Sequence, residues 1–217
     1  MKNIPVFSTE NGIASITLDQ IPYNQSAYIH MQDVSDFPEF VTECIGFCKA
    51  AGAEQIYATG LDDLKDYSVY THILQLEILK ANIPGDIGEM IPVTMETFST
   101  WKNAYNQSMR NVPGAAGADN KRAKQILENK EAYFVRYAGE IIGLGVVSAN
   151  TVHAIVSFVP RMGQTILKTL SSKIESDRFT LEVAENNFPA MKLYERCKCQ
   201  SIQRILTWYT IFNALDR

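Results

Sequence analysis

The sequence of 217 residues contains few of the residues that build metal sites, with four cysteines and three histidines. His30, His72 and His153 show no ligand spacing, and only Cys44 and Cys48 share one side of an expected helix. No Cys–His nucleophile pair can be argued from these positions. We therefore expect no metal, and buried, reduced cysteines.

Long apolar segments are also missing. No run approaches the roughly 20 residues that a membrane-spanning helix needs, and the start, MKNIPVFSTENG, lacks the apolar core of a signal peptide. The 46% apolar and 20% charged residues are typical of a soluble globular protein. The sequence predicts a cytoplasmic protein of one or two domains that does not bind membranes.

Charge is unevenly distributed along the chain. Residues 1–90 hold four Lys or Arg and thirteen Asp or Glu, a net charge of −9, whereas residues 91–217 hold sixteen and eleven, a net of +5. Either the second half attracts an anionic ligand, or the halves are surfaces of opposite sign that dock together. A net charge of −4, with no basic stripe among aromatics, argues against nucleic-acid binding.

Apolar periodicity and turn residues divide the chain at a Pro- and Gly-rich segment, residues 82–92. The first half predicts strands around one amphipathic helix that contains Cys44 and Cys48. The second half predicts two helices, a β-hairpin turning at Ala138-Gly139, a third strand, and then helix, strand, helix, strand. This order predicts an α/β fold with a mixed sheet covered on both faces, and domains at 1–88 and 91–217.

The most specific motif is LEVAENNFPAMKLYERCKC, residues 181–199. It reads as a strand, an Asn-containing turn and a helix, and it resembles the GNAT family of N-acetyltransferases over about residues 91–213. The matching positions are Leu181, Glu182, Val183, Asn187, Ala190, Leu193, Tyr194 and Glu195. Lys198 and Cys199 stand where this family usually has Gly-Phe, a departure at the helix exit.

A second motif is the segment FVPRMGQTILKTL, residues 158–170. It keeps the Pro160, Arg161 and Gly163 of the family's phosphate loop, in which free backbone N–H groups at a helix start hold a pyrophosphate. Thr165 and Leu167 occupy later glycine positions, so their side chains must point away from the phosphates. The resemblance implies acetyl-CoA as co-substrate, bound through Phe158, Val159, Arg161, Met162, Gly163, Gln164, Thr165, Ile166, Leu167, Asn187 and Ala190.

The resemblance also implies catalytic roles for two residues. Tyr194 corresponds to the tyrosine that protonates the leaving thiolate, and Glu182 to a glutamate that serves as general base. The alternatives are that Tyr194 is a core tyrosine with a satisfied hydroxyl and that Glu182 pairs with a nearby Lys or Arg. The resemblance implies a GNAT-like acyl-CoA N-acyltransferase fold in residues 91–217, with a smaller, reduced GNAT-like and non-catalytic α/β domain in residues 1–88.

Two functions of different classes follow. The first is an acyltransferase that moves an acetyl group from acetyl-CoA to a primary amine of a small molecule or peptide. The second is a non-catalytic acyl-CoA-binding or regulatory module that retains the fold. The acceptor is not readable from the sequence, although residues 111–120 and the two helices around them would shape its site in this family. The oligomeric state stays open between a monomer and a homodimer.

Overall fold

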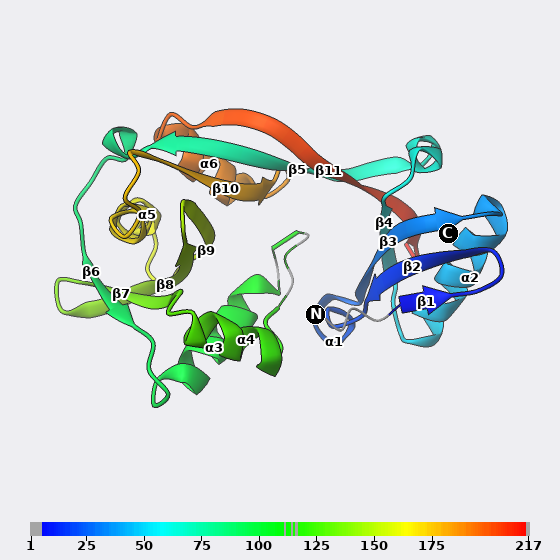
Figure 1. Ribbon diagram of the computed structural model, residues 1–217, viewed down its shortest axis with the longest axis horizontal. Coiled ribbons are helices and arrows are strands. Elements are labelled where there is room, and N and C mark those ends of the chain that lie inside the picture. The colour runs from blue at the N-terminus through cyan, green and yellow to red at the C-terminus, as the bar shows by residue number, and fades with distance from the viewer. Residues whose placement is uncertain (1–5, 111, 114, 116, 216–217) are drawn as a thin grey trace. The chain divides into compact units, whose positions relative to one another are not determined.

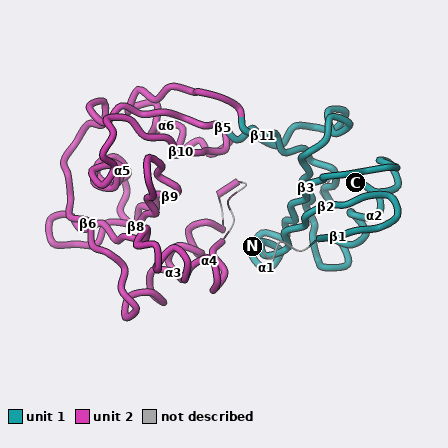
Figure 2. Tube along the Cα trace, viewed as in Figure 1, with its two compact units in different colours: residues 1–73, 205–217 teal, residues 74–204 magenta. Residues whose placement is uncertain are grey.

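The computed structural model describes residues 6–110, 112, 113, 115 and 117–215, which divide into two compact units (Figure 2). Unit 1 comprises Met1–Ile73 and Ile205–Arg217, and unit 2 comprises Leu74–Arg204. Two long strands, β5 (Ser68–Leu79) and β11 (Gln200–Asn213), contribute residues to both units. Unit 1 is therefore built from both ends of the chain, whereas unit 2 is continuous.

Unit 1 is a sheet with one long helix (Figure 1). The strands β1 (Val6–Ser8), β2 (Gly12–Thr17), β3 (Ser26–Val34) and β4 (Gln55–Thr59) lie in that order, followed by the unit 1 parts of β11 and β5. β3 and β4 are parallel and joined by α2 (Phe37–Ala50), whereas β4 and β11 are antiparallel. Two short helices, α1 (Ile21–Asn24) and η1 (Asp62–Asp66), lie in the connections.

The core of unit 1 forms where α2 packs on this sheet. Phe40, Cys44 and Cys48 recur at helical spacing and are fully buried, together with Ile29 of β3 and Ile56 of β4. α2 begins at the N-cap Asp36, whose side chain accepts a hydrogen bond from the backbone N–H of Glu39. The amphipathic helix expected from the sequence is confirmed.

Unit 2 carries the second half of the sheet. Beside the unit 2 part of β5 lie β10 (Arg178–Ala184), β9 (Thr151–Ser157), β8 (Glu140–Ser148), β7 (Ala132–Tyr137) and β6 (Glu89–Pro92), in that order. β9 and β10 are parallel, and the pairs from β9 to β6 are antiparallel. β7 and β8 form the predicted hairpin, whose turn residues Ala138 and Gly139 both have positive φ, 50° and 88°.

Helices cover both faces of this sheet, as predicted. On one face, α3 (Phe98–Met109) and α4 (Asn120–Glu128) bury Trp101 and Ile126 against Leu144 of β8. On the other face, α5 (Gly163–Ser171) buries Leu170 in a cluster that includes Ile142 of β8. α6 (Phe188–Arg196) connects β10 to β11, and η2 (Lys80–Asn82) follows β5.

Two glycines of β8 allow α5 to lie close to the sheet. A Cβ atom at Gly143 would stand 2.5 Å from the Ile166 side chain, and one at Gly145 would stand 2.2 Å from the Leu170 side chain. Any larger residue would push α5 outward. Gly143 and Gly145 therefore fix the position of α5, and with it the position of the helix start at Gly163.

The structure differs from the sequence prediction in two respects. β6 lies inside the segment expected to be a linker, because it pairs with β7, which is distant in sequence. The compact units also divide at Ile73/Leu74 and Arg204/Ile205 rather than between residues 88 and 91. Among the described residues, no helix has both the length and the apolar composition to cross a membrane.

Candidate functional site

A cavity of about 580 Å³ opens in unit 2 between the end of β9, the start of α5 and α6. Its lining comes from segments that are about 30 residues apart in the chain, so only the fold brings them together. The lining residues are Val112, Ile155, Ser157, Phe158, Val159, Pro160, Arg161, Gly163, Gln164, Asn187, Pro189, Ala190, Lys192, Leu193, Tyr194 and Arg196.

The cavity lies beyond the point where β9 and β10 stop pairing. Within the described part of the chain, their parallel ladder has one register pair, Thr180 with Thr151, near the beginning of both strands. The backbone N–H of Thr180 also donates to the carbonyl of Asn150. Among the described residues, no register pair joins Val152 or a later residue of β9 to β10. The backbone N–H and C=O groups on the edge of β9 that faces β10, called here its inner edge, are consequently free to bond with a ligand.

The start of α5 is an open helix N-terminus. The N-cap residue is Met162, which makes no side-chain cap hydrogen bond, and the first turn contains no acidic residue. The first backbone N–H with a helical acceptor is that of Ile166, which donates to the Met162 carbonyl. The N–H groups of Gly163, Gln164 and Thr165 therefore lack acceptors one turn back, which is the arrangement that binds anions.

The turn before α5 is held in an unusual conformation. Arg161 has a φ of 70°, in the left-handed region that non-glycine residues rarely adopt. The Ser157 hydroxyl donates to the Val159 carbonyl at 2.6 Å, and the Met162 N–H reaches the same carbonyl at 3.3 Å. These bonds fix the turn, and Arg161 lines the cavity as a result.

The predicted coenzyme-binding loop divides into two sets in the structure. Phe158, Val159, Arg161, Gly163 and Gln164 line the cavity. The other four residues, Met162, Thr165, Ile166 and Leu167, are outside the lining. Thr165 is 8% exposed, and Ile166 and Leu167 are fully buried, so these side chains point into the core. This orientation is the one expected for side chains that replace glycines of the loop. It leaves only the backbone of Thr165 exposed to a ligand at the start of α5.

Asn187 has a structural role as well as a place in the cavity. It is the N-cap of α6, and its side-chain oxygen accepts a hydrogen bond from the Ala190 N–H at 3.4 Å. Asn187 and Ala190, two of the residues predicted to bind the coenzyme, both line the cavity. The amide nitrogen of Asn187 is the group left to donate to a ligand.

Tyr194 lies on α6 where it reaches both the core and the cavity. The side chain is 7% exposed and lines the cavity. No hydrogen bond of its hydroxyl is recorded among the described residues. Burial, with smaller contributions from the nearby thiols of Cys197 and Cys199, raises the pKa of Tyr194 well above its usual value. The hydroxyl therefore stays protonated at neutral and moderately alkaline pH.

Glu182 is not brought into the cavity. It lies on β10 between the buried Leu181 and Val183, and its side chain is exposed on the other face of the strand. It is absent from the cavity lining. Of the two residues expected to be catalytic, the structure places Tyr194 at the cavity and leaves Glu182 outside it.

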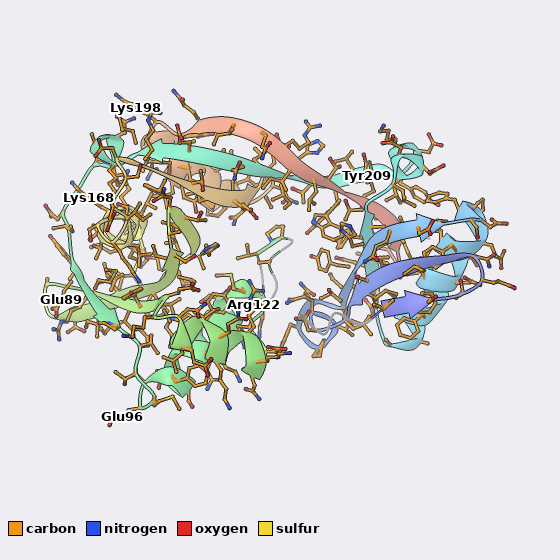
Figure 3. All side chains as sticks on the ribbon, in the orientation of Figure 1. Glu89, Glu96, Arg122, Lys168, Lys198 and Tyr209 are labelled. Carbon is orange, nitrogen blue, oxygen red and sulfur yellow. The ribbon has the colours of Figure 1, made fainter. Side chains whose placement is uncertain are left out.

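The unusual helix exit has a physical explanation. Lys198 has a φ of 51°, and the N–H groups of Lys198 and Cys199 donate to the carbonyls of Glu195 and Tyr194. This pair of bonds is a Schellman motif, in which the left-handed position after the cap is usually glycine. Lys198, labelled in Figure 3, thus takes the backbone conformation of the glycine that it replaces.

Sequence reasoning missed several lining residues. Lys192, Leu193 and Arg196 lie on α6, and Ile155 and Ser157 lie on β9. Val112 comes from the segment 111–120 that was expected to shape the acceptor site; residues 111, 114 and 116 of that segment lie outside the described residues. Helical spacing gave no signal for Lys192 and Arg196, because each is two residues from Tyr194 and so lies on another side of the helix.

Comparison with known proteins relates the fold to solved structures. No family model matches the sequence, and no curated protein sequence matches it. A GNAT-family acetyltransferase from Colwellia psychrerythraea has a TM-score of 0.51 and 13% identity over 94% of this chain and 84% of its own. A GCN5-related N-acetyltransferase from Kribbella flavida has a TM-score of 0.56 and 12% identity over 94% of this chain and 59% of its own.

A third similar structure belongs to a protein whose function is unknown, so a similar fold does not by itself identify an activity. A conserved protein of unknown function from Staphylococcus epidermidis has a TM-score of 0.53 and 9% identity, over 96% of this chain and 94% of its own. The chain has the fold of GNAT acetyltransferases, as the sequence motifs predicted. At these identities the likeness is one of fold.

Proposed function

We propose that the protein is an acyltransferase that uses acetyl-CoA as co-substrate and acetylates a primary amine. One observation carries the proposal above the others. The open N-terminus of α5 and the hydroxyl-bearing face of α6 line one cavity, at the place where β9 and β10 separate. Both motifs that led to the prediction, although distant in sequence, contribute to that cavity.

The residues present fit a phosphate-bearing thiol cofactor. The first-turn N–H groups of α5 and the Arg161 guanidinium provide donors for a pyrophosphate. The apolar side chains of Ile155, Val159 and Leu193 suit an uncharged arm, and the amide nitrogen of Asn187 suits an amide carbonyl on it. The cofactor, when bound, supplies an activated acetyl group.

The chain's own groups would then act on protons and charge. Unpaired backbone N–H groups on the inner edge of β9 would donate to an oxygen that becomes negative. The Tyr194 hydroxyl, kept protonated by burial, would hold a proton at the point where a thiolate needs one. Glu182 would take the proton of the acceptor amine from outside the cavity, directly or through water.

The experiment that tests the proposal combines binding with turnover. Coenzyme A at a hundredfold excess over its Kd should stabilise the folded chain by about 2.7 kcal/mol, visible as a raised Tm. Acetyl-CoA with a panel of amines, amino acids and peptides should then yield acetylated products by mass spectrometry. No binding at millimolar coenzyme would overturn the proposal. Binding without any product across the panel would favour the non-catalytic module.

A further inference from the structure

Two cations on α6 line the cavity without any recorded partner. Lys192 and Arg196 are both in the lining, and both are exposed to solvent. Among the described residues, no ion pair or hydrogen bond is recorded for either side chain. The recorded ion pairs of unit 2 are Arg136 with Glu89 and Arg178 with Glu77, and neither involves α6. Within the part of the chain that the structure describes, Lys192 and Arg196 therefore line the cavity as cations with no recorded ion pair.

Their spacing makes this arrangement unfavourable without an anion. Residues four apart on a helix lie on one face, about 6 Å apart along the axis. Like charges at this spacing repel each other and destabilise the helix slightly. The cavity lining contains three cationic residues, Arg161, Lys192 and Arg196, and it contains no Asp or Glu. The lining as a whole thus favours an anionic ligand.

Helix-start donors and side-chain cations act on phosphates in different ways. At the start of α5 the N–H groups are fixed in the backbone and the side chains of Thr165, Ile166 and Leu167 are turned into the core, so a phosphate must come close to the backbone to meet these donors. Flexible cations do not need such close approach, because Lys and Arg reach outward to phosphate oxygens. Lys192 and Arg196 lie on α6 and line the same cavity as the helix start.

We infer that Lys192 and Arg196 form a side-chain phosphate clamp for the nucleotide end of coenzyme A, an inference that rests on the proposed function. The clamp adds side-chain charge to the phosphate recognition that the backbone N–H groups at the start of α5 supply. It makes the site selective for thiols that carry phosphates over the bare pantetheine arm. The competing role for Arg196 is purely structural, as a cation near the C-terminus of α6.

The test is calorimetric titration of the full chain with coenzyme A, 3′-dephospho-coenzyme A and pantetheine. The double variant Lys192→Gln/Arg196→Gln should lose about tenfold to a hundredfold in coenzyme A affinity, because two charge-assisted phosphate contacts disappear. Its affinity for pantetheine should not change. A loss with coenzyme A alone places the clamp on the 3′-phosphate, and a loss with both nucleotides places it on the diphosphate; either result supports the clamp.

A matched control separates the clamp from general charge. Lys124→Gln/Arg204→Gln removes the same net charge from exposed positions of unit 2 that do not line the cavity, and it should leave all three affinities near wild type. The inference is overturned if the α6 variant loses no more coenzyme A affinity than this control. It is also overturned if the variant loses pantetheine equally, or loses only thermal stability. Wild-type protein that binds no coenzyme A would instead overturn the proposed function.

Discussion

Two segments of the molecule have the same order, a strand, a helix and a second strand parallel to the first. In unit 1 these are β3, α2 and β4, and in unit 2 they are β9, α5 and β10. β3 and β4 pair continuously, with five register pairs from Ser26 with Gln55 to His30 with Thr59. β9 and β10 have one recorded pair, Thr180 with Thr151. Continuous pairing uses the backbone groups that separated strands leave for a ligand.

The helix starts differ in the same direction. α2 begins with Asp36, whose carboxylate accepts from its own first turn, and Pro38 and Glu39 follow. α5 begins with Met162 and Gly163, with no side-chain cap and no acid. At the start of α2, an anion would be repelled by the Asp36 carboxylate, and Pro38 has no N–H to donate. At the start of α5, an anion would find free N–H groups. A few residues therefore decide whether a strand–helix–strand segment has its backbone groups paired, as in unit 1, or leaves them free to bind a ligand, as in unit 2.

Replacing Tyr194 should have the largest effect, because it removes the proposed proton donor from the site in unit 2. We expect Tyr194→Phe to lower turnover by about tenfold to ten-thousandfold with coenzyme A binding nearly unchanged, since the ring remains. Because the pKa of Tyr194 is raised, the wild-type rate should not lose this donor below about pH 10. Steady-state kinetics from pH 7 to 10 and calorimetry measure both. Unchanged turnover with a good acceptor would assign Tyr194 to packing.

The difference between the helix starts predicts one coenzyme site per chain. Calorimetric titration should give one coenzyme A per chain, with no site in residues 1–88. Gln164→Glu places a carboxylate in the first turn of α5, as Glu39 is placed in α2. It should stabilise the helix by about 0.3–1 kcal/mol through the helix dipole and weaken coenzyme A binding by about tenfold.

The Gln164→Glu variant is informative because it should raise stability while it weakens coenzyme A binding. A substitution that only damaged the fold would lower both. Glu39→Gln in α2 is the matched control, and it should leave coenzyme A binding unchanged. A stoichiometry of two coenzyme A molecules per chain would contradict the assignment of unit 1 to scaffold.

Alkaline pH should lower the stability of unit 1 first. Burial raises the pKa of Cys44 and Cys48 to about 12, and that of Cys197 to about 11. Unfolded thiols ionise near pH 8.5, so these folded thiols hold their protons more tightly than the unfolded chain does. Their contribution is complete below about pH 8.5 and declines as pH rises toward the folded values.

The free energy of unfolding should therefore fall between about pH 8.5 and pH 11. Urea titrations with reductant at several pH values measure this fall. A probe of unit 1, such as Trp208 fluorescence, should report the loss at least as early as a probe of unit 2, such as Trp101. A free energy that stays constant from pH 7.5 to 10 would show that the thiols ionise normally in the fold.

The smallest effect concerns the two helix exits. α2 and α6 both end in a Schellman motif, with Gly52 at φ 97° in one and Lys198 at φ 51° in the other. Lys198→Gly should raise the free energy of unfolding by about 0.5–1 kcal/mol, because it removes left-handed strain. Gly52→Ala should lower the free energy by about 1 kcal/mol. Chemical denaturation measures the free energy of unfolding of both variants. If both changes raised it, or both lowered it, backbone strain would not be what distinguishes the C-terminal ends of α2 and α6.

Local patterns predicted most elements, and long-range pairing explains what they missed. The hairpin at Ala138-Gly139 and the amphipathic stripe of α2 follow from turn chemistry and periodicity within a few residues. β6 was missed because its strand character depends on β7, some 40 residues later. The place of residues 205–217 in unit 1 depends on β11 pairing with β4, about 150 residues earlier.

The candidate site shows the same division. Tyr194, Asn187 and the loop at Arg161 were predicted because each belongs to a compact motif. The position of Glu182 outside the cavity depends on how β10 lies relative to the cavity, which no residue of β10 lines, and the motif does not encode this arrangement. Lys192 and Arg196 were missed because charged residues on an exposed helix are usually solvated, and only the cavity distinguishes them.

The last strand of the chain sets the order in which the protein can be completed during synthesis. β11 lies between β4 and β5, with the His72 ring nitrogen 2.9 Å from the Thr207 hydroxyl. The polypeptide of unit 2, Leu74–Arg204, is therefore synthesised before the segment of β11 that pairs with β4 in unit 1. Until residues 205–213 emerge, β4 exposes an unpaired edge to chaperones and to neighbouring nascent chains. The site-bearing unit can thus mature first, while the amino-terminal unit is assembled last.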